Sequence, residues 1–303
     1  MSGEDERSLA YGGQALMEGV MMRSGDTMVM CVRQPDNGIA THSITINSVT
    51  KRFKPFSFPF IRGVAMLFET MYYGVQSMMY SANVALEEED DEFTVFDYAL
   101  LVVMVLAMNG LFIAIPFVLT NYLKLTGVVF NVVESVVRLA MFAGYLYVIS
   151  LWGEVARVLQ YHGAEHKAIN AFEAGSNMEV ESVVKFSRLN PRCGTSFLFL
   201  TVLTSMALFA LIPRTTFVAR LTYRLALFPV IAGVSYEVLK LSDKYRDSSV
   251  MQLIIKPGLA FQKLTTKEPT PDMIEVAIKA LQKVREIREG EPSNSSEQDE
   301  PYN

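Results

Sequence analysis

Long uncharged segments dominate the hydrophobic pattern of the chain. Residues 98–123 contain no charged side chain, and these 26 residues at helical rise exceed the roughly 20 that cross a bilayer core. Residues 193–213 form a second uncharged run that is just long enough to span. Residues 127–152 and 220–241 are apolar with few charges. The pattern therefore predicts four membrane-spanning helices.

A few charged residues interrupt these apolar segments. Glu134 and Arg138 lie four residues apart, so on one helix they can pair with each other inside a bundle. Arg224 and Glu237 stand at the two edges of the last apolar core, where a carboxylate can reach the membrane surface. Mutual pairing and membrane-edge exposure account for these charges without an ion pathway.

Lysine and arginine are distributed unevenly around the expected spans. Seven precede Asp97, five lie between residues 154 and 192, and ten follow Leu239, whereas the connections on the opposite side carry few. The positive-inside rule therefore places both termini and the central loop in the cytoplasm of a multi-pass inner-membrane protein. The net charge of −5 and the absence of a dense basic run give no indication of direct DNA binding.

The N-terminal region has a different pattern. Residues 14–23, 26–34 and 38–47 are β-rich runs separated by turn residues, which predicts a small antiparallel sheet. Residues 51–60 mix cations, aromatic rings and prolines, a composition typical of a linker that lies against a bilayer. Residues 61–86 are helical with apolar side chains on more than one face, so this helix is packed in protein, interfacial or re-entrant.

The C-terminal region predicts two helices and a tail. Residues 248–266 suggest a helix broken at Pro257 and Gly258. Residues 271–287 form an amphipathic helix with an apolar stripe that needs a partner surface. The tail, 289–303, is polar and predicted to be disordered.

The expected fold is therefore an α-helical polytopic membrane protein of about four spans, with a cytoplasmic α+β layer that includes the small N-terminal antiparallel β-sheet. The cytoplasmic pieces are too short to build separate cores, so they should fold together. The predicted organisation is a meander and helix in 1–93, a transmembrane hairpin in 94–152, a cytoplasmic loop in 153–192, a second hairpin in 193–241, cytoplasmic helices in 242–288 and the tail in 289–303.

The clearest chemical motif lies in the central loop. His162 and His166 are one helical turn apart, the spacing that lets two imidazoles reach one cation, and Glu165 completes an HxxEH order. In that arrangement the carboxylate serves as the general base on a water molecule held at a divalent metal such as zinc. The structural alternative is that both rings only bind carbonyls or lipid headgroups.

A zinc enzyme needs a third protein ligand. His42 on the third predicted strand, Glu237 at the end of the last span and Cys193 are the candidates, and the sequence does not select among them. Cys193 follows Asn190 and Pro191 at a helix start, where a thiolate is favoured, although it can equally be a small apolar residue there. With Cys31 as the second cysteine of the chain, no structural disulfide is expected.

Several short stretches together resemble one bacterial membrane family, the domain of unknown function 1385. They are "GGQALMEGVMMR" (12–23), "YHGAEHKAI" (161–169), "PRCGTSF" (191–197), "AGVSYE" (232–237) and "KPGLAFQKLTTKEP" (256–269). The resemblance implies a membrane fold and a metal site, because members are described as predicted metal-dependent enzymes. The family pattern has histidine where this chain has Asn190, which replaces a stronger ligand type by a weak amide oxygen.

Two classes of function follow from these observations. The first is a metal-dependent hydrolase-like enzyme with its site close to the cytoplasmic membrane face, where a lipid-linked or membrane-embedded substrate would fit. The second is a non-enzymatic scaffold or biogenesis factor that binds a membrane-protein complex or the translation and insertion machinery through the helices 61–86 and 271–287. Convergence of the two histidines with a thiolate or carboxylate favours the enzyme.

Overall fold

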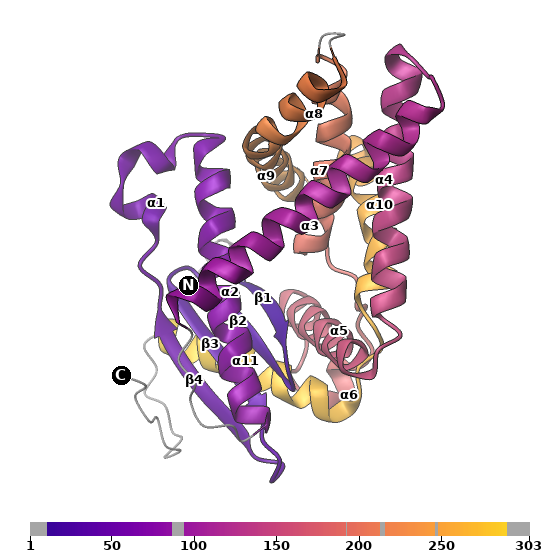
Figure 1. Cartoon of the computed structure of the whole chain (residues 1–303). Coiled ribbons are helices and arrows are strands. Elements are labelled where there is room, and N and C mark those ends of the chain that lie inside the picture. Colours follow the sequence, from indigo (N-terminus) through magenta and orange to yellow (C-terminus); the bar gives the residue numbers. More distant parts are fainter. Residues whose placement is uncertain (1–10, 87–93, 192, 213–215, 246–247, 290–303) are drawn as a thin grey trace.

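A computed structural model describes residues 11–86, 94–191, 193–212, 216–245 and 248–289. It is mostly helical, with one small sheet near the N-terminus (Figure 1). The predicted C-terminal tail, apart from Glu289, lies outside the described residues.

The sheet is an antiparallel meander of four strands in chain order. The strands are β1 (Tyr11–Leu16), β2 (Gly19–Ser24), β3 (Thr27–Arg33) and β4 (Ile39–Thr45). The prediction of three strands was wrong because the run 14–23 folds back at Met17 and Glu18, where Glu18 has a φ of 51°. That two-residue turn contains none of the Asn-Gly or Asp-Gly pairs that mark a hairpin in a sequence.

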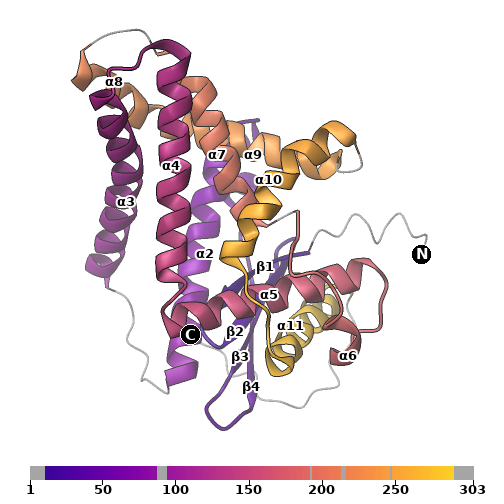
Figure 2. The ribbon, with the colours of Figure 1, turned by 90° about the vertical axis from the view of Figure 1, so that its right-hand side faces the viewer.

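Helices cover both faces of the sheet (Figure 2). On one face lie α5 (Gly153–Glu173) and α11 (Pro271–Glu289), which share a continuous apolar core with β1, β2 and β3. On the other face lies α2 (Ile61–Leu86), which packs on a methionine-rich cluster. This double coverage explains why β2 and β3 are buried along most of their length. We call this part, with the short α6 (Val180–Val183), the sheet layer.

The helix α2 has the predicted bounds and an unusual burial pattern. Its buried positions are small or polar, including Gly63, Ser77 and Ser81, whereas Phe68 and Tyr72 are exposed. Small residues let α2 approach both the sheet and a second helix, α9 (Phe228–Lys244). The segment before it contains α1 (Val49–Arg52) and a 3₁₀ turn, η2 (Lys54–Ser57), and it exposes several phenylalanines.

The remaining helices form a second part, which we call the apolar bundle (Figure 1). It contains α9 together with α3 (Val95–Tyr122), α4 (Gly127–Ile149), α7 (Gly194–Phe209), α8 (Phe217–Ala226) and α10 (Ser249–Thr265). The bundle is held together by contacts of α4 with α3 and α7, and by contacts of α7 with α9 and α10.

Fewer helices can span a membrane than the four that the sequence predicted. Within the described residues, α3 and α4 are long and apolar enough, and α8 with α9 makes a third candidate although this pair is bent by 44°. The helix α7 has 16 residues, about 24 Å at helical rise, which is shorter than the roughly 30 Å hydrocarbon core. The described part of the chain thus contains two candidate spans, or three if the bent pair counts as one.

The predicted break in the helix 248–266 is absent. The helix α10 runs through Pro257 and packs closely on α7, where a Cβ on Gly258 would lie 3.3 Å from the Ser196 hydroxyl. The interhelical packing offsets the backbone hydrogen bond that proline cannot donate. Of the two C-terminal helices, α10 therefore packs on α7 and α4 within the apolar bundle, whereas α11 packs on the sheet beside α5.

Candidate metal centre

The helix α5 carries the HxxEH motif into the junction between the sheet layer and the apolar bundle. His162 and His166 lie one turn apart, with ring centroids separated by 4.4 Å. Gly163 permits the close approach that fixes this helix, because a Cβ there would lie 2.1 Å from the carbonyl oxygen of Lys267. The segment after α10 therefore packs directly on the turn of α5 that carries both rings.

A backbone carbonyl orients each histidine. The Nδ1 atom of His162 lies 2.7 Å from the carbonyl oxygen of Thr265, and that of His166 lies 2.6 Å from the carbonyl oxygen of Arg188. A carbonyl only accepts, so each Nδ1 carries the proton and donates it. Each Nε2 is then left with a lone pair, which is the state that binds a metal.

Cys193 completes a cluster of three potential ligands. It is the N-cap residue of α7, and its Sγ accepts a hydrogen bond from the backbone N–H of Thr195 at 3.4 Å. The same Sγ lies 3.1 Å from Nε2 of His162. One ligand atom each from His162, His166 and Cys193 lies within 4.8 Å of the others, and this is the metal-ligand group that the described part of the chain provides.

The donor set suits a transition metal such as zinc. Bonds of about 2.0–2.3 Å in a tetrahedral site put ligand atoms roughly 3.3–3.7 Å apart, so closure needs a shift of about 1 Å at most. Two imidazoles and a thiolate are borderline-soft ligands that favour zinc over magnesium or calcium. Three protein ligands also leave a fourth position open, as in catalytic rather than structural zinc sites.

Glu165 lies beside this cluster and is buried. Its side chain has an Oε2 atom 4.0 Å from Nε2 of His162 and no hydrogen-bond partner for that oxygen among the described residues. Burial raises the pKa of Glu165 to about 7, an effect that His162 partly opposes. Gly13 on β1 makes room for it, since a Cβ there would lie 2.9 Å from its carboxyl carbon.

Two sequence-predicted ligand candidates lie elsewhere. The carboxylate of Glu237 accepts a hydrogen bond from Arg62 Nε at 2.6 Å, which joins α9 to the start of α2. The ring of His42 on β4 stacks on Tyr80 with a centroid separation of 5.1 Å. Neither joins the cluster of the other three candidates.

Asn190 lies close to the site, and its backbone is held by the side chain of Gln262. Its backbone N–H donates to Gln262 Oε1 at 2.9 Å, and its carbonyl accepts from Gln262 Nε2 at 2.6 Å. Gln262 is fully buried and also donates to Ser196, so it fixes the start of α7 and with it Cys193. Sequence reasoning missed this glutamine and the two carbonyls, because long-range backbone contacts leave no local pattern.

A cavity of about 420 Å³ opens over the cluster. Its wall is formed by strand β1, by helices α2, α5 and α7, and by the segment before α7. The lining residues include Gly12, Gly13, Thr70, His162, Glu165, His166, Asn190, Cys193, Thr195 and Leu198. Strand β1 is an edge strand of the sheet. The potential ligands therefore face a space large enough for a substrate segment.

Comparison with known proteins places this site in a family. The model of a family described as "Protein of unknown function (DUF1385)" matches residues 58–287, so the chain belongs to this family. It is also 35% identical over 295 residues to the "Uncharacterized protein YqhQ" of Bacillus subtilis (strain 168), with 90% of this chain and 91% of that protein covered. No solved structure matches significantly.

Proposed function

We propose that this protein is a membrane-bound, metal-dependent hydrolase whose centre consists of His162, His166 and Cys193. The observation that carries the proposal is the convergence of three ligand atoms beside a buried carboxylate with an unpartnered oxygen. A divalent metal in such a site would lower the pKa of a water molecule and polarise the bond to be cleaved. Purely structural histidines would give no reason for a buried carboxylate to lie 4.0 Å from the Nε2 atom of His162.

Glu165 is the proposed general base. Its carboxylate would accept a proton from the water as the oxygen attacks the carbonyl carbon, and it would return that proton to the leaving group. Gly13 and the turn of α5 hold this carboxylate against the cavity, so its position is set by packing.

An extended peptide is the substrate class that the cavity favours. Leu16 and Gly19 flank the two-residue turn and therefore form a hydrogen-bonded pair. Hydrogen-bonded and non-hydrogen-bonded pairs alternate along an antiparallel ladder, so Gly13 and Ala15 direct their N–H and C=O groups away from β2. In the described residues these groups make no other backbone hydrogen bond, and both residues line the cavity. A substrate segment could therefore pair with β1 and pass its carbonyl over Glu165.

The proposed setting is the cytoplasmic face of an inner membrane, with both termini on that side. Thr195 and Leu198, in the first turns of α7 in the apolar bundle, line the same cavity as the motif, so the centre would lie close to the membrane surface. This location suits cleavage of membrane-embedded or membrane-linked substrates.

Metal content is the first test. Purified wild-type protein should hold near-stoichiometric zinc, manganese or iron, and the double variant His162→Ala/His166→Ala should lose it. His42→Ala is the matched control, because it removes the remaining histidine and should keep the metal. If folded wild-type protein holds no metal and takes up none on dialysis against zinc, the metal centre is disproved.

Turnover is the second test. Peptides from a digested membrane proteome would be incubated with zinc-loaded protein and cleavage followed by mass spectrometry. Glu165→Gln should retain its metal and lose activity by about 10² to 10⁴-fold, the usual contribution of a general base. Metal binding without any Glu165-dependent cleavage would favour the alternative, a scaffold that docks a partner on the exposed rings of Phe68 and Tyr72 of α2.

A further inference from the structure

The apolar bundle contains a second buried polar group, remote in sequence from the metal centre. Glu134 on α4 pairs with Arg138 at 2.5 Å and also with Arg224 of α8. Glu134, Arg138 and Arg224 are each no more than 6% exposed. Among the described residues, one carboxylate thus faces two guanidinium groups, and this cluster has a surplus positive charge.

Aromatic rings compensate this charge only in part. The guanidinium carbon of Arg224 lies 4.5 Å from the ring centre of Phe117 and 4.6 Å from that of Phe209, and Arg138 lies 5.1 Å from Phe209. A third arginine, Arg220, stacks on Phe117 as well and adds more positive charge. Ring faces attract cations but do not neutralise them.

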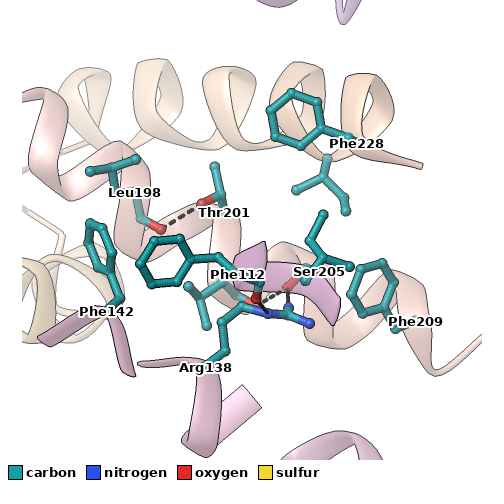
Figure 3. Close-up of a pocket in the computed structure, with 11 residues that line it drawn as sticks. Phe112, Arg138, Phe142, Leu198, Thr201, Ser205, Phe209 and Phe228 are labelled. Carbon is teal, nitrogen blue, oxygen red and sulfur yellow. Dashed lines mark hydrogen bonds between the residues drawn. The ribbon is translucent and has the colours of Figure 1, made fainter. Parts of the chain in front are cut away.

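A pocket of about 130 Å³ opens directly beside Arg138. Figure 3 shows its guanidinium next to Ser205, to which Nη1 donates at 2.7 Å, and next to the Phe112 carbonyl. The rest of the wall is almost entirely apolar, from α3, α4, α7 and α9, and consists of Phe112, Ile113, Phe142, Leu198, Thr201, Val202, Phe209, Phe228 and Ile231. Charge is thus available at one place in an otherwise hydrophobic pocket.

We propose that this pocket binds the carboxylate end of a long-chain fatty acid. The carboxylate would accept hydrogen bonds from Arg138 and supply the missing negative charge, while the first carbons fill the phenylalanine-lined space. A cavity of similar volume in an apolar core takes up a benzene molecule, so the remaining acyl chain would run outward along the helices.

Depth and size favour a carboxylate over a phospholipid headgroup. Arg138 lies eleven residues into α4, about 16 Å along a helix of 23 residues, which is near the middle of the proposed span. A glycerophosphate headgroup would have to leave the membrane surface to reach it, whereas a single protonatable carboxyl group crosses hydrocarbon at lower cost.

Photocrosslinking in nanodiscs of neutral phosphatidylcholine tests the proposal. The probe is palmitic acid with a diazirine in its chain, and the crosslinked peptides are mapped by mass spectrometry. We expect saturable labelling of α4 and α7 that unlabelled palmitate suppresses and that hexadecanol, which has no charge, does not.

Two variants and one control sharpen the test. Arg138→Gln leaves Glu134 and Arg224 as a one-to-one pair, so the bundle should fold, and labelling should fall at least about tenfold with the lost charge-assisted hydrogen bond. Thr201→Phe fills the pocket and keeps all charges, with the same expected loss. Ala207→Phe adds the same ring at an exposed position of α7 outside the pocket and should change nothing.

Three results would overturn the proposal. Equal competition by hexadecanol would mean that only the apolar surface binds the probe. Competition by phosphatidylglycerol but not by palmitate would assign the pocket to a phosphate headgroup. Unchanged labelling in Thr201→Phe, with a melting temperature like that of wild type, would place the probe elsewhere. None of these results depends on the metal centre, which uses different residues.

Discussion

The candidate metal centre and the arginine cluster both bury ionisable groups, but they differ in whether those groups can become neutral. Histidine, cysteine and a carboxyl group with its pKa raised to about 7 can all be uncharged near neutral pH. Arginine remains charged under every relevant condition. The centre at the junction can therefore exist with or without a bound cation, whereas Arg138 and Arg224 need permanent compensation inside the bundle.

This difference indicates different uses of buried polarity. At the junction, one backbone carbonyl fixes the tautomer of each histidine, so the rings are oriented but not neutralised. In the bundle, one carboxylate is shared by two cations, so removal of a single group changes the charge balance of several helices. The stability of the fold should thus depend more on the cluster of Glu134, Arg138 and Arg224, and catalytic activity more on the residues at the junction.

The largest effect is expected from Glu134→Gln. It leaves two buried arginines without a carboxylate, and breaking a buried ion pair in this way costs about 3–5 kcal/mol. Thermal unfolding in detergent, followed by circular dichroism, should show a large loss of stability or no folded protein. The double variant Glu134→Gln/Arg224→Gln should recover part of it.

Glu154→Gln is the control for that experiment, because this glutamate is exposed in the first turn of α5. Its effect should lie within about 0.5 kcal/mol. A loss below about 1 kcal/mol for Glu134→Gln would show that the bundle does not depend on the shared carboxylate.

A smaller effect is expected from Gly163→Ala. The added Cβ would meet the Lys267 carbonyl oxygen at 2.1 Å, so α5 must move away from the segment that holds His162. Such overpacking costs about 1–3 kcal/mol and should also reduce metal content.

The matched substitution is Gly153→Ala at the start of the same helix, where nothing lies within 4 Å of a Cβ. It should be neutral or stabilising by less than about 1 kcal/mol. Equal behaviour of the two alanine variants would contradict the close approach of α5 to this segment.

These two regions also show what the sequence could predict. Local periodicity predicted the bounds of α2, the start of α11 and the pairing of Glu134 with Arg138, which the structure confirms at four residues apart on one helix. Such features depend on neighbours in the sequence, so a pattern of hydrophobic and charged positions is sufficient to find them.

Contacts between distant segments were not predictable in the same way. Arg224 was assigned to a membrane edge, yet it lies 1% exposed against a carboxylate ninety residues earlier in the chain. Apolar composition also did not reveal that α7 ends at Phe209 or that the last predicted span is bent at Leu227, before Pro229. At the junction, the motif was visible in the sequence, but only the tertiary fold shows that Cys193, rather than His42 or Glu237, lies beside the two histidines.

The smallest effect concerns thiol reactivity and leaves stability unchanged. Burial raises the pKa of Cys31 on β3 from 9.0 to about 11, so its thiolate fraction at pH 8 falls about 100-fold. Cys193 is partly exposed and lines the cavity at the junction. A water-soluble methanethiosulfonate reagent should therefore modify Cys193 in the native protein and Cys31 only after unfolding, and added zinc should protect Cys193. Rapid modification of native Cys31 would contradict the packed core between β3 and the helices, and indifference of Cys193 to zinc would count against its role as a ligand.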